Sequence, residues 1–261
     1  MALDPEAVVT VSGRSAAPLF PDFLEREVAE VLGDVASAVI EGFGADLRAI
    51  VLFGSAAEGR MRLTSDVNLL VVLERVNPLA AEKVRPGLQL AEAAIELHVM
   101  VVLANEMQWA AEAFSLKFDD MEHRHFVVWG EDPFTKVTIP RPLLLHRIRQ
   151  VLLNTALRLR SIYMVGSPRE ETLAVAVANA AAPLRRAAFA FYELRGQSAG
   201  SPKEALEAIC REMPGEWTKD LAQLSLARES ARLPAGTAEP LLLRLSEMAM
   251  AVHKLFDDVA P

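Results

Sequence analysis

Short apolar runs and helically spaced apolar residues alternate through the first half of the chain. Three runs have the length and β-branched content of buried strands, at residues 48–53, 67–73 and 95–103. Apolar residues recur at helical spacing in the segments 21–42, 78–94 and 106–116. Pro86 falls within the second of these segments and is expected to interrupt or kink it. The short run 126–129 is expected to form an edge strand that closes the sheet.

The second half of the chain has a different pattern, with helical spacing only. The helical stretches lie near residues 142–164, 168–195, 203–212, 217–230 and 238–257. This pattern predicts an antiparallel helical bundle. The whole chain is therefore predicted to be α+β, with a β-sheet flanked by helices and followed by an all-α bundle. The expected boundaries are a loose N-terminal arm at 1–18, a first domain at 19–140 and a helical domain at 141–261.

Two strand ends in the first domain carry polar residues that suit a phosphate and a metal ion. The first strand runs into Gly54 and Ser55, where a glycine lets the backbone approach an anion closely. A helix beginning at Ser55 would add a favourable dipole. The second strand is preceded by Ser65 and Asp66 and contains Asn68. Because residues i and i+2 of a strand share a face, the oxygens of Asp66 and Asn68 are expected to point the same way.

This arrangement resembles the signature of the DNA polymerase β-like nucleotidyltransferase superfamily. The similarity rests on Gly54-Ser55, a spacer containing Gly59-Arg60, and Ser65-Asp66-Val67-Asn68 before a hydrophobic strand. It is close over residues 45–75 and looser over 20–135, and it implies that the sheet is mixed. The family pattern has a second carboxylate where this chain has Asn68, and a third on a later strand.

The resemblance implies transfer of a nucleoside monophosphate from a nucleoside triphosphate to a hydroxyl group, with magnesium as cofactor. In that case Gly54, Ser55, Arg60 and Ser65 would bind the triphosphate, and Asp66 would be the first metal ligand. Asn68 would be a weak second ligand, since an amide oxygen brings no charge.

The third ligand is expected on the strand at 95–103. Glu96 and His98 share one face of that strand with Met100 and Val102, so either could reach Asp66. Glu96 would complete a carboxylate pair, whereas imidazole suits softer metals. Glu96 is therefore the candidate third acid, and a solvated strand-entry glutamate is the alternative.

Two functional classes follow from the missing carboxylate at Asn68. The first is an enzyme that transfers a nucleoside monophosphate to a small molecule or a protein, with weakened or lost catalysis. The second is an inactive nucleotidyltransferase fold that binds nucleotides or other proteins. A homo-oligomer or a partner subunit that supplies the missing acid also remains open.

Charge and composition limit the kinds of partner and the cellular location that can be expected for the chain. Residues 1–140 contain 11 Lys/Arg and 22 Asp/Glu, and the whole chain has a net charge of −8. An acidic chain without a basic run disfavours a large nucleic-acid surface. The longest apolar stretches are too short to cross a membrane. The start of the sequence lacks the pattern of a signal peptide, and the single Cys210 suits a reducing cytoplasm.

A cluster of titratable residues follows the segment 106–116. Asp119, Asp120, His123 and His125 could be read as metal ligands, but their spacing matches no strong motif. A solvated acidic helix end is the preferred interpretation. The segment 114–134 also resembles a stretch of small bacterial nucleotidyltransferase-domain proteins, in which a glutamate commonly stands in place of Lys117.

Overall fold

The computed structural model describes residues 17–61, 66–166 and 169–259 of the chain. The arm predicted at 1–18 therefore lies almost entirely outside the described residues. The described chain forms two compact units. We call them the sheet unit, with residues 17–61, 66–105 and 124–135, and the helical unit, with residues 106–123, 136–166 and 169–259. The segment 106–123, which precedes the expected boundary at residue 140, is thus part of the helical unit.

The sheet unit is built on four strands in the order β3-β2-β1-β4. These strands are β1 (Leu47–Phe53), β2 (Val67–Leu73), β3 (Leu97–Leu103) and β4 (His125–Gly130). The β2–β3 pair is parallel, whereas β1 pairs antiparallel with both β2 and β4. The sheet is therefore mixed, as predicted, and β4 is an edge strand.

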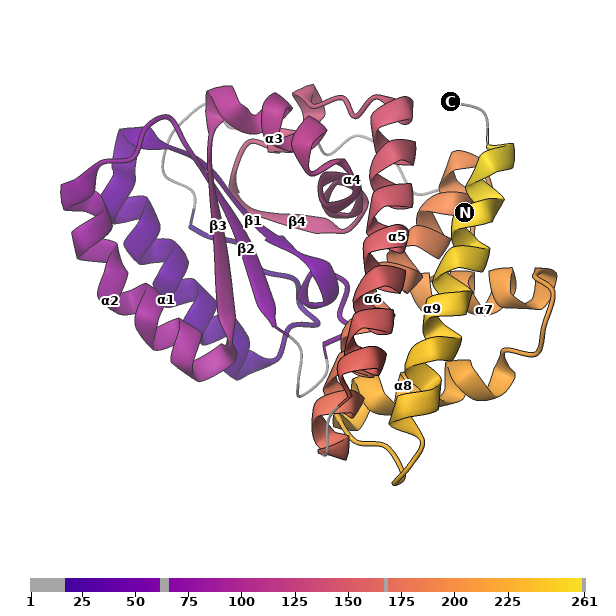
Figure 1. Ribbon diagram of the computed structural model, residues 1–261. Helices are drawn as coiled ribbons and strands as arrows, with labels where there is room; N and C mark the ends of the chain where they lie inside the picture. Colours follow the sequence, from indigo (N-terminus) through magenta and orange to yellow (C-terminus); the bar gives the residue numbers. More distant parts are fainter. Residues whose placement is uncertain (1–16, 62–65, 167–168, 260–261) are drawn as a thin grey trace, which may run out of the picture. The chain divides into compact units, whose positions relative to one another are not determined.

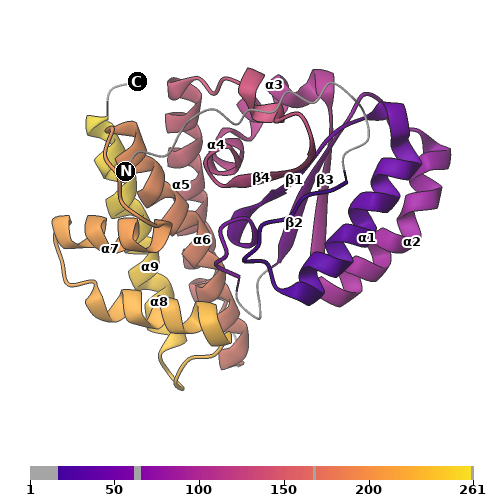
Figure 2. The same cartoon turned by 180° about the vertical axis from the view of Figure 1, so that it is seen from behind.

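One face of the sheet is covered by two helices, α1 (Arg26–Phe43) and α2 (Pro78–Ile95), as both ribbon views show (Figures 1 and 2). Their apolar side chains bury Val67, Leu69 and Val71 of β2, which alternate along the strand. Asn77 is the N-cap of helix α2, and its side chain accepts hydrogen bonds from the backbone N–H groups of Leu79 and Ala80. It continues through Pro86, so the expected interruption does not occur.

The pairing of β1 with β4 depends on a glycine. Gly130 has φ +88°, and a Cβ at this position would lie 2.1 Å from the backbone oxygen of Arg48. No side chain fits between these two strands at that point. Gly130 thus lets the end of β4 lie against β1, where it pairs with Ala49.

The described residues of the helical unit form seven helices, and α6 is the central one. Its elements are α3 (Met107–Ala113), α4 (Ser115–His123), α5 (Arg141–Val165), α6 (Glu170–Leu194), α7 (Pro202–Glu212), α8 (Thr218–Ser230) and α9 (Ala238–Leu255). Helix α6 contacts α5, α7, α8 and α9. Its buried face is rich in alanine, which lets neighbouring helices approach closely. The helix expected at 106–116 is divided at Phe114 into α3 and α4, and α4 continues to His123.

The described residues are 67% helical and contain a four-stranded mixed sheet, so the predicted α+β class is confirmed. None of the helices in the described ranges combines the length and the apolar character that a bilayer crossing requires.

Candidate functional site

The turn that follows β1 adopts a conformation that favours glycine. Gly54 has φ +79°. Residues Gly54–Ala56 form one 3-10 turn, and the Arg60 N–H donates to the Ser55 carbonyl at 2.9 Å. A helix with a useful dipole therefore does not begin at Ser55. Anion binding here would depend on backbone N–H groups and the Ser55 hydroxyl.

Asn68 lies beside this turn, on the neighbouring strand β2. It pairs with Phe53 in the β1–β2 register, and a Cβ on Gly54 would lie 3.9 Å from Asn68 Nδ2. Since Val67 and its alternating neighbours pack against α1 and α2, the half-buried Asn68 side chain faces the other side of the sheet. Exposed Asp66 directly precedes β2, and the Asn68 Nδ2 donates to its backbone oxygen at 3.4 Å.

Glu96 reaches the same end of the sheet, although it is not part of a strand. The expected strand at 95–103 begins only at Leu97. Glu96 is the C-cap of α2, with φ +50° and ψ +46°, and its side chain is exposed. Its carbonyl accepts a hydrogen bond from the Val67 N–H at 3.4 Å. Because β2 and β3 are parallel, Glu96 and Asp66 both lie where these two strands begin.

The other candidate for a third ligand, His98, is the register partner of Asn68. Paired residues of neighbouring strands point to the same face, so exposed His98 lies beside Asn68. The structure therefore brings Gly54, Asp66, Asn68, Glu96 and His98 to one end of the sheet.

The arginines near the turn have different surroundings. Arg60 is exposed and lies 4.0 Å from the Glu58 carboxylate, which is 3.1 Å from the guanidinium of Arg124. The Arg124 carbonyl accepts the Gly54 N–H at 3.2 Å. Ser65 lies outside the described residues.

The sequence analysis missed Arg124 and Glu58, which hold the turn in place. They are 66 residues apart, and no local pattern signals that they meet.

A second group of titratable side chains lies in the helical unit. Asp119 and His123 of α4 and Glu193 of α6 have candidate ligand atoms within 4.8 Å of one another. Burial and the Glu193 carboxylate raise the pKa of Asp119 to about 7. Burial alone would lower the pKa of His123, but the Asp119 carbonyl and the nearby carboxylates outweigh it and raise that pKa.

The interpretation of this segment as a solvated helix end agrees with the exposure of His123 at the end of α4, but not with Asp120. Asp120 is buried, and its carboxylate lies 3.4 Å from the Arg186 guanidinium. His125 belongs to β4 and pairs with Asp132 at 3.3 Å. Burial and the charge of Arg186 lower the pKa of Lys117. The four residues therefore do not form one cluster, because α4 directs Asp120 away from Asp119 and His123.

The oxygen-rich group at the start of β2 has donors whose chemistry suits a magnesium ion. Hard divalent cations prefer carboxylate and amide oxygens, which Asp66, Glu96 and Asn68 supply. The absence of a Cβ at Gly54 leaves room beside Asn68. The group has one negative charge fewer than a set of three carboxylates.

Comparison with known proteins identifies the class of this fold. Residues 35–127 match the model of the family described as nucleotidyltransferase domain. This match confirms the resemblance to polymerase β-like nucleotidyltransferases that was inferred from the sequence motif. Curated proteins gave no match to the chain.

Solved structures with a similar fold include the spectinomycin adenyltransferase AAD(9) from Enterococcus faecialis, crystallised with ATP and spectinomycin. It is 12% identical, with a TM-score of 0.56, and the match covers 85% of this chain and 98% of that chain. At this identity the likeness shows the fold. A toxin–antitoxin structure with AMP-PNP is 17% identical over 51% of this chain and 98% of that chain, and its TM-score of 0.28 adds nothing to the assignment.

Proposed function

We propose that this protein transfers a nucleoside monophosphate from a magnesium-bound nucleoside triphosphate to a hydroxyl group, with weakened turnover. The observation that carries the proposal is the convergence of the Gly54–Ser55 turn with Asp66, Asn68 and Glu96 at one end of the sheet. The match of residues 35–127 to the nucleotidyltransferase domain family supports it.

Each residue has a distinct part in this proposal. The turn at Gly54 and Ser55 binds phosphate oxygens through its backbone and hydroxyl group, and exposed Arg60 adds a positive charge. Asp66, Asn68 and Glu96 would hold magnesium, which supplies charge neutralisation for the triphosphate and the leaving pyrophosphate. Orientation of the triphosphate then depends on the fixed spacing between the turn and β2.

Asn68 is the reason to propose weakened turnover. Two unit charges 4 Å apart interact by ~1 kcal/mol in water and ~4 kcal/mol at an effective dielectric constant of about 20. Asn68 is half buried, so the free energy of the missing carboxylate–cation attraction should lie between these two limits for each unit of cation charge. The consequence is weaker metal binding and less charge compensation during pyrophosphate departure.

The second candidate function is a catalytically inactive domain that binds nucleotides or a protein partner. Asn68 favours this function too, because binding tolerates the loss of a charge better than catalysis does. A partner subunit or a second copy that contributes the missing acid would be a variant of the first function.

A small molecule is the preferred acceptor. The net charge of −8 disfavours nucleic acid. The structurally similar AAD(9) was crystallised with spectinomycin, a small molecule, together with ATP. A protein hydroxyl remains the alternative acceptor.

Calorimetric titration with each nucleoside triphosphate, with and without magnesium, tests the proposal. We expect one nucleotide to bind in a magnesium-dependent manner, and Asp66→Ala to abolish that dependence. The matched control is Asp34→Ala, which removes an exposed carboxylate from α1 on the opposite face of the sheet and should leave binding unchanged. Failure of every nucleotide to bind would refute both nucleotide-based functions.

Asn68→Asp separates the two candidate functions. If the site retains its other groups, the added carboxylate should tighten magnesium-dependent binding by about tenfold or more. It should also raise pyrophosphate release in the presence of hydroxylated small molecules. Tighter binding without any pyrophosphate release from either protein would favour the inactive domain.

A further inference from the structure

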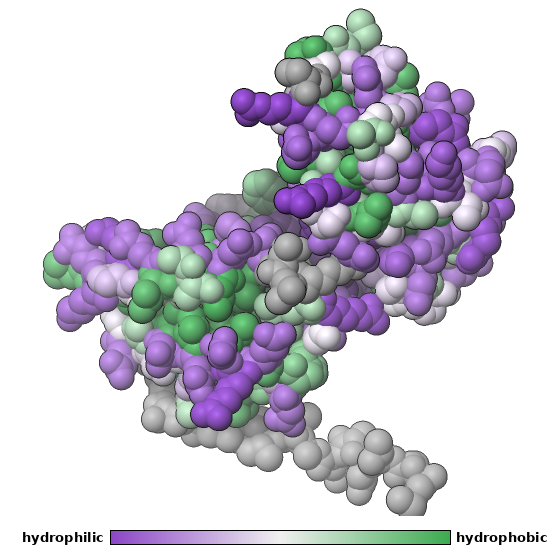
Figure 3. Space-filling view, turned by 90° about the horizontal axis from the view of Figure 1, so that it is seen from below, coloured by the Kyte–Doolittle hydropathy of each residue, from purple (hydrophilic) through white to green (hydrophobic). Residues whose placement is uncertain are grey.

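Between the sheet and α2 lies an apolar cavity that is separate from the candidate nucleotide site. Its volume is about 210 Å³, and its lining includes Val71 of β2 and Val99 and Val101 of β3. Val101 is 52% exposed although it lies within a strand. Space-filling Figure 3 shows apolar side chains gathered on part of the sheet unit and framed by polar ones.

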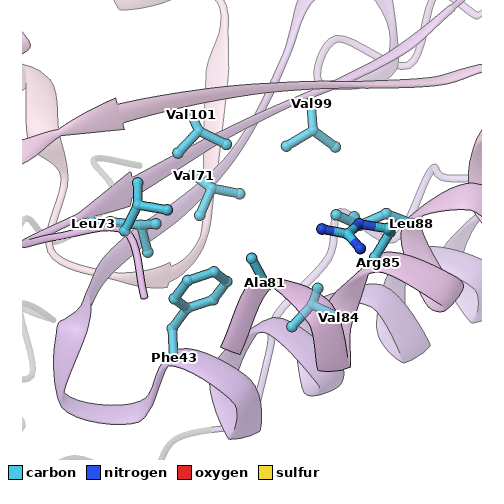
Figure 4. Close-up of a pocket in the computed structure, with 10 residues that line it drawn as sticks. Phe43, Val71, Leu73, Ala81, Val84, Arg85, Leu88, Val99 and Val101 are labelled. Atoms are coloured by element: carbon cyan, nitrogen blue, oxygen red, sulfur yellow. The ribbon is translucent and has the colours of Figure 1, made fainter. Parts of the chain in front are cut away.

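The helix side of this cavity has one unexpected residue. Ala81, Val84, Arg85 and Leu88 follow the i, i+3, i+4, i+7 spacing that forms one stripe on a helix, and all four line the cavity. Three of them are apolar. In Figure 4 the Arg85 guanidinium is turned toward the space between α2 and the valines of the strands.

Arg85 has no counter-charge in this position. In the described part of the chain its guanidinium has no hydrogen-bond or ion-pair partner. By contrast, Arg48 and Arg75 in the same unit pair with Glu74 and Asp46. An arginine in an apolar stripe beside an open apolar cavity is suited to a ligand with an anionic head and an apolar tail.

We propose that this cavity binds a small amphipathic carboxylate, with its hydrocarbon tail between β3 and α2 and its carboxylate on Arg85. The charge of the arginine selects an anionic head, and a guanidinium can bind a carboxylate through two parallel hydrogen bonds. The cavity is smaller than the roughly 300–1,000 Å³ of sites for drug-sized ligands, so a short straight chain fits it better than a ring system.

The site does not depend on the proposed nucleotidyl transfer. Val71 and Leu73 line the cavity from the β2 face that packs against α1 and α2, whereas Asn68 points to the opposite face. The two ligands would therefore bind without competing for the same space. If the protein failed to bind nucleotides, binding of a carboxylate in the cavity could still be measured, and the reverse also holds.

Three ligands of graded chemistry test the proposal by calorimetry and by NMR of valine methyl groups. Octanoate has both tail and head, octanol has the tail with a neutral head, and acetate has the head alone. We expect octanoate to bind at least about tenfold more tightly than octanol, since hydrogen bonds between charged groups are stronger than those to a neutral hydroxyl, and acetate not to bind. Octanoate should shift the methyl signals of Val99 and Val101.

Two substitutions on α2 and one control substitution on the same helix separate the contributions of the head and the tail of the ligand. Arg85→Gln should reduce octanoate affinity to that of octanol, while Lys83→Gln, which removes an exposed cation outside the stripe, should change nothing. Ala81→Leu should fill the cavity and weaken both ligands, with circular dichroism as the check on folding. Because Arg85 is exposed, its replacement leaves the core of the sheet unit intact.

Several results would overturn the proposal. These are no binding of octanoate, equal binding of octanoate and octanol, or methyl shifts confined to residues outside the cavity. Methyl shifts that change with protein concentration in the absence of ligand would show that a second copy of the chain covers the cavity instead.

Discussion

Gly130→Ala offers a direct test of how β4 is joined to the rest of the sheet. A Cβ at this position would lie 2.1 Å from the Arg48 oxygen and 3.0 Å from the Ala49 Cα, both of them backbone atoms. Since Cβ atoms essentially never approach closer than 3.0 Å, the strands must separate by about 1 Å. The effect should spread toward Gly54, whose N–H is bonded to Arg124 just before β4.

The expected cost has two parts. A non-glycine residue in the left-handed region costs roughly 1–2 kcal/mol, and loss of one strand-pairing hydrogen bond costs roughly 0.5–1.5 kcal/mol. The sum is roughly 1.5–3.5 kcal/mol. Gly44→Ala is the matched control, because Gly44 also has positive φ, at +49°, yet nothing lies within 4 Å of its Cβ position. It should lose only the backbone part.

Urea unfolding followed by far-UV circular dichroism measures both variants. With a slope of about 2 kcal/mol per molar urea, in the middle of the usual range for small proteins, Gly130→Ala should move the transition of the sheet unit by roughly 1–2 M, and Gly44→Ala by less. Equal shifts for the two variants would refute the argument, because the contact with Arg48 would then contribute nothing.

Three further predictions concern the helical unit. The pKa of Asp119 is raised from 3.8 to about 7, so between these two pH values the folded protein keeps a proton that the unfolded chain has released. The free energy of unfolding should therefore fall as the pH rises from 3.8 to about 7. The raised pKa of His123 acts in the same direction, and Asp119→Asn should flatten the slope of urea midpoint against pH. Arg186→Met removes the partner of a carboxylate that is 8% exposed and should destabilise by about 2 kcal/mol, whereas Arg26→Met breaks an exposed pair and should cost less than ~1 kcal/mol in the same assay. Burial raises the pKa of Cys210 to about 12, so a thiol reagent at pH 8 should label it only at the rate of unfolding; fast labelling of the folded protein would contradict this.

Elements with a strong local period were predictable from the sequence. The three apolar runs became β1, β2 and β3 within one or two residues of their expected ends, because buried strands need continuous apolar side chains. Helix α2 shows that one proline does not reliably predict the end of a helix. Packing against α1 outweighs the missing N–H of Pro86, and the helix continues.

Long-range contacts were not predictable in the same way. Asp66 and Asn68 are two residues apart, so their proximity follows from the strand period. The meeting of Glu58 with Arg124 and of Asp119 with Glu193 depends on how distant segments pack, which no local pattern encodes. Glu96 was expected inside a strand, but the left-handed cap of α2 takes this position and β3 starts one residue later.

The parallel pairing of β2 with β3 has a consequence for the order of assembly. Asp66 and Glu96 lie next to strands that meet only after α2 has crossed over the sheet, so this end of the sheet cannot exist in a partly folded chain. A chain emerging from the ribosome would lack the acidic pair until the whole crossover has formed. Any nucleotide that binds there would select completed molecules and shift the folding equilibrium toward them.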